Sequence, residues 1–220
     1  MKIYAHDPRF ILNGRDDSKT DAVVVREIWC ENVYEVFDGD LADTGIVIDI
    51  GANIGAFSVF AAHLGAKKVI AVEPEKGNLN LLRHNTADNQ QHVPDCEFII
   101  EDSGIAGQAG TAQITDEHGD SRVYLESPNE RLQKIKLMTL EDLFKKYKLE
   151  FVDILKLDIE GLEGQVLINT PENIMKLCRY ITLEYDQHAE DLGAIVEKLS
   201  KTHQVKVVGA HGGMIFGKRY

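Results

Sequence analysis

The segment that most constrains the fold is a short apolar run that ends in a glycine turn. Residues 46–55 read IVIDIGANIG, and a helical pattern follows at once. A run that is almost wholly apolar is typical of a central strand covered on both faces. Glycines directly after such a strand let the backbone pass close to a ligand, and the next helix begins with unpaired N–H groups. The run predicts a strand, a turn that binds a ligand and a helix, although a plain tight turn also uses such glycines.

The spacing of these glycines differs from that of dinucleotide-binding proteins. Their fingerprint is G-x-G-x-x-G, whereas residue 53 is Asn and no glycine stands two positions after Gly51. Asn tolerates the left-handed conformation and can replace glycine there. Glu73 ends the second apolar strand, about 20 residues after Gly51, where a carboxylate can bind both hydroxyls of a ribose. The pattern therefore favours a ligand that contains a ribose.

Further apolar runs alternate with helical patterns, which is the order of a parallel sheet with crossover helices. The expected strands are residues 46–50, 69–72, 97–100, 151–157, 179–184, 204–208 and 214–216. The expected helices are residues 21–30, 55–64, a stretch after 74, 139–146 and 189–200. Two alternating segments, 111–115 and 122–125, indicate an inserted β-hairpin. We expect an α/β fold that closes with a second hairpin.

The first 44 residues show no strand pattern and one amphipathic helix, whose Val25 and Trp29 are expected to face inward. A segment this short cannot build a core of its own. We therefore expect residues 1–44 to form an N-terminal helical cap. Residues 45–220 would form the main domain, with the hairpin insertion near residues 107–126.

Acidic residues outnumber basic ones, with 36 Asp and Glu against 24 Lys and Arg, so the formal net charge is −12. This balance argues against a nucleic-acid partner and against docking on an anionic membrane. No apolar run reaches the roughly 18 residues of a membrane span, and the N-terminus does not resemble a signal peptide. Three scattered cysteines are expected to be buried free thiols, which is typical of a cytoplasmic protein.

Polar and apolar residues alternate in the run LKLDIEGLE at residues 155–163. Period two places Lys156, Asp158 and Glu160 on one side of a strand, towards its carboxyl end, where ligands of open α/β sheets bind. A lysine within such a strand must be paired, and the nearby carboxylates are its candidate partners. The pair alone could be structural, but we expect Asp158 to be functional and Glu163 to favour the start of the next helix.

At this point the chain resembles a known class of enzymes. The run D-x-G-x-N-x-G at residues 49–55, followed by V-E-P at 72–74, resembles motif I and its downstream acid in class I S-adenosylmethionine-dependent methyltransferases. Residues 155–163 resemble the L-K-x-D-x-E-G-x-E signature of the FkbM family within that class. The resemblance implies a Rossmann-like seven-stranded sheet, mostly parallel with an antiparallel C-terminal hairpin, and helices on both faces. It also implies an O-methyltransferase for a hydroxyl of a sugar, a glycan or a small metabolite.

The resemblance also assigns roles to individual residues. The turn would line the methionine end of S-adenosylmethionine, the acid after the second strand would hold the ribose, and the loop after the third strand would contact the adenine. The residues expected around the cofactor are Asp49, Gly51, Ala52, Asn53, Gly55, Glu73, Pro74, Asn78, Asp102 and Ser103. Asp158 is expected to orient and deprotonate the acceptor hydroxyl, with Lys156 beside it and Glu160 as the alternative base.

Several alternatives remain open at this stage. A nucleic-acid methyltransferase and a dinucleotide-binding oxidoreductase are the competing functions. No spacing suggests a metal site, and we expect metal-independent catalysis, although Asp158 and Glu184 together have the ligand chemistry for Mg²⁺. Tyr34 and His188 are candidates for side chains that overhang the pocket. The sequence leaves the acceptor and the oligomeric state undetermined.

Overall fold

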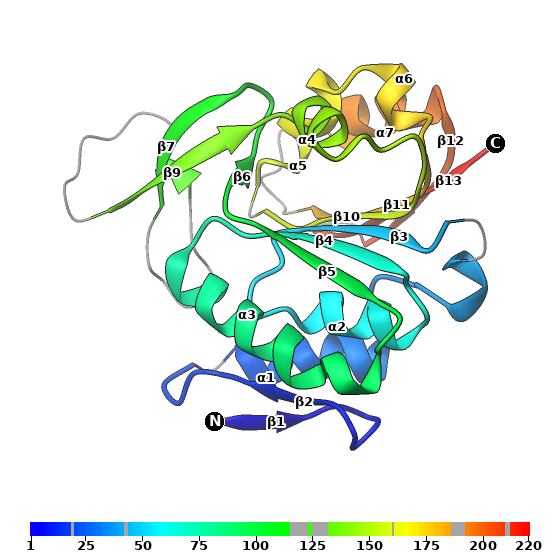
Figure 1. Cartoon of the computed structure of the whole chain (residues 1–220). Coiled ribbons are helices and arrows are strands. Elements are labelled where there is room, and N and C mark those ends of the chain that lie inside the picture. The colour runs from blue at the N-terminus through cyan, green and yellow to red at the C-terminus, as the bar shows by residue number, and fades with distance from the viewer. Residues whose placement is uncertain are drawn as a thin grey trace.

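A seven-stranded sheet runs through the centre of the computed structural model, with helices on both faces (Figure 1). The structure describes residues 1–18, 20–41, 44–114, 123–124, 132–159, 161–185, 192–209 and 212–220. The strands, in sheet order, are β5 (Glu97–Glu101), β4 (Lys68–Val72), β3 (Ile46–Ile50), β10 (Val152–Leu157), β11 (Cys178–Tyr185), β13 (Gly213–Arg219) and β12 (His203–Val208). β13 runs antiparallel to both of its neighbours, β11 and β12, and the other pairs of strands are parallel. The expected seven-stranded sheet with its terminal hairpin is confirmed.

Two helical layers cover this sheet. On one face lie α1 (Asp21–Arg26), α2 (Ala56–His63) and α3 (Lys76–Asn89); on the other lie α4 (Leu140–Tyr147), α5 (Glu163–Asn169), α6 (Glu172–Met175) and α7 (Leu192–Ser200) (Figure 1). Val47, Val69 and Ile154 pack with the first layer, whereas Ile48 and Leu155 pack with the second. Successive strand residues therefore enter different cores, which explains why the central strands are apolar throughout.

Side chains cap the starts of two helices. Thr139 caps α4 in a capping box with Asp142, and the Glu75 side chain caps the start of α3. The helix expected over residues 189–200 is α7, and residues 189–191 lie outside the described part of the chain.

The N-terminal segment corrects one expectation. It contains an antiparallel hairpin of β1 (Lys2–Tyr4) and β2 (Ile11–Asn13), whose strands are too short to show alternation in the sequence. The helix expected from residue 21 is present, but after α1 it continues as the π-helix η1 (Glu27–Glu31), and the 3-10 helix η2 (Asp38–Leu41) follows. Cys30 is exposed on η1, so the expectation of three buried thiols holds only for Cys96 and Cys178.

The inserted hairpin belongs to a second, four-stranded sheet. Its order is β6 (Gly104–Ile105), β9 (Gln133–Met138), β7 (Gly110–Ile114) and β8 (Val123–Tyr124). β7 and β8 pair antiparallel as expected, although residues 115–122 and 125–131 lie outside the described part. The sequence analysis missed β9. The 3-10 helix η3 (Gln90–His92) completes the elements, and the division of the chain after residue 44 stays a prediction.

Within the described residues, no helix is long and apolar enough to cross a membrane. The location of the protein in the cell stays a prediction.

The N-terminal segment is expected to unfold together with the main sheet rather than separately. The Trp29 ring is buried against Phe10 and Phe60, and its Nε1 donates to the Ala56 carbonyl oxygen of α2. Trp29→Ala should therefore lower the free energy of unfolding by about 3–5 kcal/mol. Denaturant unfolding should show one transition, and Phe37→Ala, which truncates an exposed ring of the same segment, should change little. A separate early transition would contradict this expectation.

Candidate active site

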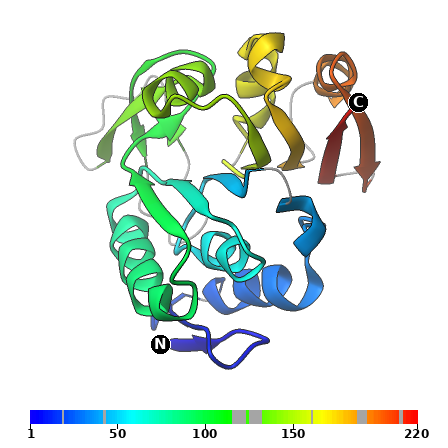
Figure 2. The ribbon, with the colours of Figure 1, turned by 45° about the vertical axis from the view of Figure 1, so that its right-hand side comes forward.

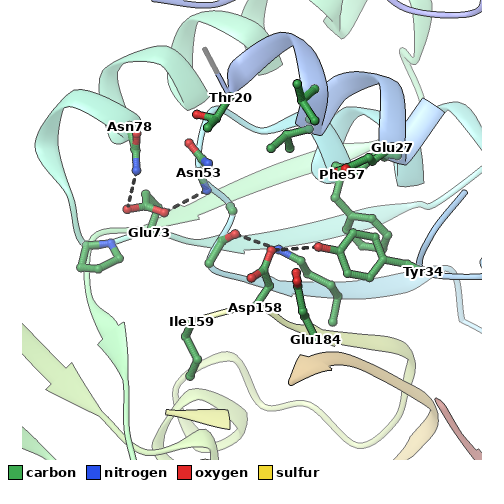
Figure 3. Close-up of a pocket in the computed structure, with 18 of the residues that line it drawn as sticks. Thr20, Glu27, Tyr34, Asn53, Phe57, Glu73, Asn78, Asp158, Ile159 and Glu184 are labelled. Atoms are coloured by element: carbon green, nitrogen blue, oxygen red, sulfur yellow. Dashed lines mark hydrogen bonds and ion pairs between the residues drawn. The ribbon is translucent and has the colours of Figure 1, made fainter. Parts of the chain in front are cut away.

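A cavity of about 340 Å³ lies at the carboxyl ends of β3, β4, β10 and β11, beneath the N-terminal segment (Figure 3). This volume is within the range of small-molecule sites. Its lining residues are Thr20, Val23, Val24, Glu27, Ile28, Tyr34, Gly51, Ala52, Asn53, Ala56, Phe57, Glu73, Pro74, Asn78, Ile114, Lys156, Asp158, Ile159 and Glu184. The structure thus brings together residues from the turn, the acid after β4 and the end of β10.

The glycine turn after β3 has the backbone conformation that the sequence indicates. Gly51, Asn53 and Gly55 all have positive φ, at +74°, +49° and +88°, which confirms that Asn53 replaces glycine in the left-handed region. A Cβ on Gly51 would lie 1.7 Å from the carbonyl oxygen of Asp158. The neighbouring strand therefore requires glycine at residue 51 before any ligand binds.

Two of the predicted cofactor residues support the turn from outside the cavity. A Cβ on Gly55 would meet the Leu82 side chain of α3 at 2.7 Å, so this glycine allows close helix packing. Asp49 is fully buried beneath the turn, where its Oδ2 accepts a hydrogen bond of 2.6 Å from the Ser58 hydroxyl.

Lys156 joins the turn to the end of β10. Its Nζ lies 3.1 Å from Asp49 Oδ1 and 3.4 Å from Asp158 Oδ2, and it donates to the Gly51 carbonyl oxygen at 2.8 Å. This confirms the expectation that carboxylates pair with the lysine. Burial alone lowers the pKa of Lys156, but the two carboxylates outweigh it and raise the pKa above its ordinary value.

Glu73 is buried on the opposite side of the cavity. Its Oε2 accepts from the Asn53 backbone N–H at 2.9 Å, and its Oε1 accepts from the Glu75 N–H at 2.9 Å and from Asn78 Nδ2 at 3.3 Å. Burial raises the pKa of Glu73 to about 7, although these hydrogen bonds oppose the shift.

The N-terminal segment contributes a chain of contacts to this side. Asn78 Oδ1 accepts from Arg15 Nη1 at 2.7 Å, and Arg15 pairs with the buried Asp21 carboxylate. Sequence reasoning missed Arg15 and Asp21, because nothing in the local pattern around them signals a contact with α3.

Asp158 faces the cavity from the end of β10. Its Oδ2 accepts a 2.8 Å hydrogen bond from the Tyr34 hydroxyl, as Figure 3 shows. Burial and the neighbouring Asp158 charge raise the pKa of Tyr34 well above its ordinary value, so this hydroxyl keeps its proton. At the cavity edge, partial burial and the Asp158 charge raise the pKa of Glu184 to about 7.

Other predicted residues lie elsewhere. Asp102 is exposed on the loop after β5, and Ser103 is buried with its hydroxyl 3.3 Å from Met138 Sδ; neither lines the cavity. Glu160 and His188 lie outside the described residues.

Among the described residues, no group of three His, Cys, Asp or Glu side chains is arranged to hold a metal ion.

Comparison with known proteins identifies the family. A model of the FkbM methyltransferase domain matches residues 49–206. The chain belongs to the FkbM methyltransferase family. Methyltransferase sdnD of Sordaria araneosa is 25% identical to this FkbM-family chain over 201 residues, covering 76% of each protein. The antimetabolite synthetase AmbE of Pseudomonas aeruginosa is 26% identical over 196 residues, which are 73% of this chain and 9% of AmbE.

Solved structures agree on the fold. An FkbM methyltransferase from Methylobacillus flagellatus superimposes with a TM-score of 0.58 at 13% identity, over 88% of this chain and 47% of that one, so the chain spans about half of its length. A precorrin-6y C5,15-methyltransferase from Geobacter metallireducens gives 0.52 at 14% identity, over 99% and 98% of the two chains. These structures share the methyltransferase fold with this FkbM-family chain.

The residues of the cavity fit S-adenosylmethionine, the cofactor of this family. Glu73 presents a buried carboxylate to hydroxyl donors, and Asn53 Oδ1 is buried without a hydrogen-bond partner among the described residues. The carboxylates of Glu27, Asp158 and Glu184 also line the cavity, while its buried lysine is already paired. A ligand with ribose hydroxyls and a positive charge suits this arrangement.

Binding of S-adenosylhomocysteine should strengthen as the pH rises through about 7. The ordinary pKa of a glutamate is 4.5, whereas Glu73 in the folded protein keeps its proton up to about pH 7. The free energy of unfolding should therefore fall as the pH rises from about 4.5 to 7. Ribose hydroxyls donate best to the ionised form, so binding should release a proton. Calorimetry should show affinity rising at least about fivefold from pH 5.5 to 8.

The matched variants for this prediction are Glu73→Gln and Glu184→Gln. Glu73→Gln should weaken binding about 30-fold or more at pH 8 and remove most of the pH dependence. Glu184→Gln should change the affinity and its pH dependence far less, because its carboxylate, whose pKa is also raised to about 7, lies apart from Glu73 (Figure 3) and S-adenosylhomocysteine lacks the sulfonium charge. A pH dependence that persists in Glu73→Gln would contradict the assignment.

Gly51→Ala should disturb the turn itself. The added Cβ must displace the Asp158 carbonyl, and the positive φ adds strain. We expect a loss of more than about 2 kcal/mol in the free energy of unfolding together with loss of S-adenosylhomocysteine binding. Gly39→Ala is the control, because a Cβ there meets nothing within 4 Å. Equal stability of the two variants would show that the turn is not constrained by β10.

Proposed function

We propose that this chain transfers a methyl group from S-adenosylmethionine to a hydroxyl oxygen of a sugar, a glycan or a small metabolite. The observation that carries the proposal is the Asp158 carboxylate, which lines the same cavity as the glycine turn and Glu73. A carboxylate in that position is suited to accept the proton that a hydroxyl loses when it attacks a methyl group.

Methyl transfer is an in-line displacement, so the acceptor oxygen must be held about 3 Å from the methyl carbon. Within the described residues, both polar contacts of the Asp158 carboxylate, with the Tyr34 hydroxyl and the Lys156 amino group, go to Oδ2. This leaves Oδ1 for the acceptor hydroxyl. The two contacts hold the carboxylate in one orientation, and Glu163 holds the following turn through the N–H groups of Ile159 and Gly161.

Lys156 acts in this proposal as a positioning residue. Its amino group is engaged by two carboxylates and the Gly51 carbonyl oxygen, and its side chain is almost fully buried. Bound S-adenosylmethionine would supply a methyl group activated by the adjacent sulfonium charge. Glu73 would accept hydrogen bonds from the ribose, and the acidic lining would stabilise the positive charge. Glu160 remains the alternative base.

The alternatives are less well supported. Hydride transfer is set aside by membership of a methyltransferase family. A nucleic-acid acceptor fits poorly, because the carboxylates of Glu27 and Glu184 line the cavity and the chain has a net charge of −12, so phosphates would be repelled. We propose metal-independent catalysis; activity abolished by EDTA and restored by Mg²⁺ would contradict this.

Asp158→Asn should separate catalysis from cofactor binding. The change keeps shape and hydrogen bonding but removes the base, so turnover should fall about 10²-fold or more. The affinity for S-adenosylhomocysteine should change little. The measurement is transfer of a tritiated methyl group over a panel of glycans, phenols and hydroxylated metabolites, with calorimetry on the same samples.

Tyr34→Phe is the matched variant, because it removes one hydrogen bond to Asp158 and keeps the base. It should lower turnover far less than Asp158→Asn. If Asp158→Asn loses cofactor binding instead, Asp158 belongs to the cofactor site and the proposed role is wrong.

A further inference from the structure

A second cavity, of about 310 Å³, lies on the same face of the sheet as α1 and α2. Its floor is formed by β10, β11, β13 and β12, and Tyr34, Glu35, Val36 and Asp40 line it from the N-terminal segment. Figure 2 shows this segment opposite the β12–β13 hairpin. We call it the Thr182 cavity. Its lining residues are Tyr34, Glu35, Val36, Asp40, Ile154, Tyr180, Ile181, Thr182, Gln204, Val205, Lys206, Phe216, Gly217 and Lys218. Neither the motifs nor the proposed reaction uses it.

The Thr182 cavity lies next to the candidate active site, because Tyr34 lines both. Lys156 is paired in register with Thr182, Thr182 with Phe216, and Phe216 with Lys206. Side chains opposite one another in a sheet point to the same face, so this row leads from the buried lysine of the active site across the floor of the second cavity. At the start of this row, Tyr34 contacts Asp158 through its hydroxyl.

One residue that lines this cavity has a buried polar atom without a hydrogen-bond partner in the described part of the chain. Thr182 is 3% exposed, and its Oγ1 makes no hydrogen bond within the described residues. Leaving a buried hydroxyl unpaired is costly, so such an atom marks a place where a ligand can supply the missing bond. Around it stand the rings of Tyr34, Tyr180 and Phe216 and the side chain of Ile154. These surfaces suit a flat apolar ring that carries a hydrogen-bonding group.

The lining carries two carboxylates, Glu35 and Asp40, and two lysines, Lys206 and Lys218. Asp40 Oδ2 accepts a hydrogen bond from the Phe37 backbone N–H. Lys206 is already paired with Glu35 at 2.7 Å. Lys218 lies with its Nζ 5.6 Å from the centre of the Tyr180 ring, and no carboxylate of the described residues forms an ion pair with it. An anionic group on the ligand would form an ion pair with this exposed lysine.

We propose that the Thr182 cavity binds the body of the methyl acceptor, as a flat cyclic molecule with a hydrogen-bonding group facing Thr182 and an anionic group beside Lys218. The inference rests on the proposed function, since the acceptor hydroxyl would reach Asp158 past the edge of the Tyr34 ring. It narrows the acceptor class from hydroxyl compounds in general to amphipathic ring compounds with a negative charge.

The test uses two fluorescent probes on the whole chain with saturating S-adenosylhomocysteine, which fills the first cavity. The probes are 1-anilinonaphthalene-8-sulfonate and N-phenyl-1-naphthylamine, which has the same rings without the sulfonate. Gln204→Trp narrows the Thr182 cavity, and Val207→Trp, on the opposite face of β12, is its control. Gln204→Trp should weaken the binding of both probes about tenfold or more, whereas Val207→Trp should change the binding of neither. Lys218→Gln should weaken only the sulfonate probe, by about two- to fivefold.

Equal probe binding by the wild type, Gln204→Trp and Lys218→Gln would overturn the proposal. So would a dimer in sedimentation experiments that only Gln204→Trp dissociates, because a second copy would then occupy this face.

Methyl transfer separates the two proposals. For any accepted ring compound, Gln204→Trp should lower kcat/KM without changing S-adenosylhomocysteine affinity. If methyl transfer is lost in Asp158→Asn but unchanged in Gln204→Trp, the proposed function stands and the proposed role of the Thr182 cavity is wrong. Probe binding at the cavity without S-adenosylhomocysteine binding would instead overturn the proposed function.

Discussion

The ion-pair group around Lys156 is the interaction on which the rest of the site depends. A lysine almost fully buried in the central sheet is tolerated only because Asp49 and Asp158 flank its amino group. One carboxylate comes from β3, before the glycine turn, and the other follows β10. The same amino group donates to the Gly51 carbonyl oxygen. A single cation thereby sets the distance between the turn, which would hold the cofactor, and the carboxylate, which would act on the acceptor.

The close approach of the two strands explains the glycine in the turn. At residue 51 the backbone runs against the carbonyl oxygen of Asp158, so no side chain fits there. The left-handed conformation of Asn53 then aims its backbone N–H at Glu73. Backbone contacts between neighbouring strands and with Glu73 therefore set the geometry of the proposed cofactor site.

The N-terminal segment completes the site that the sheet begins. Arg15 reaches Asn78 on the ribose side, and Tyr34 reaches Asp158 on the acceptor side. Helix α2 is buried on every side because it lies between the sheet and this segment. These contacts are compatible with the expected cap. The cap is not purely helical, however, since it also contains the β1–β2 hairpin. Both cavities are lined in part by residues of this segment.

What the sequence determined by itself is local. The apolar period of the strands, the glycines and Asn53 of the turn, and the capping box of α4 all follow from backbone preferences within a few residues. These signals predict the sheet and predict that Glu73, Lys156 and Asp158 lie near one another, because residues at the ends of adjacent parallel strands meet at one edge. The short strands β1 and β2 were missed, because three residues carry no readable period.

Only the tertiary structure decided which distant residues share a cavity. The contacts of Arg15, Tyr34 and Thr182 depend on how the N-terminal segment crosses the sheet and on the register of β10 with β11. Asp102 and Ser103 do not line the first cavity, since the direction of a loop after a strand is set by the elements that pack on it. Their contact with the adenine stays a prediction. Local preferences set each element, whereas the relative placement of the elements comes from packing that no short run of sequence encodes.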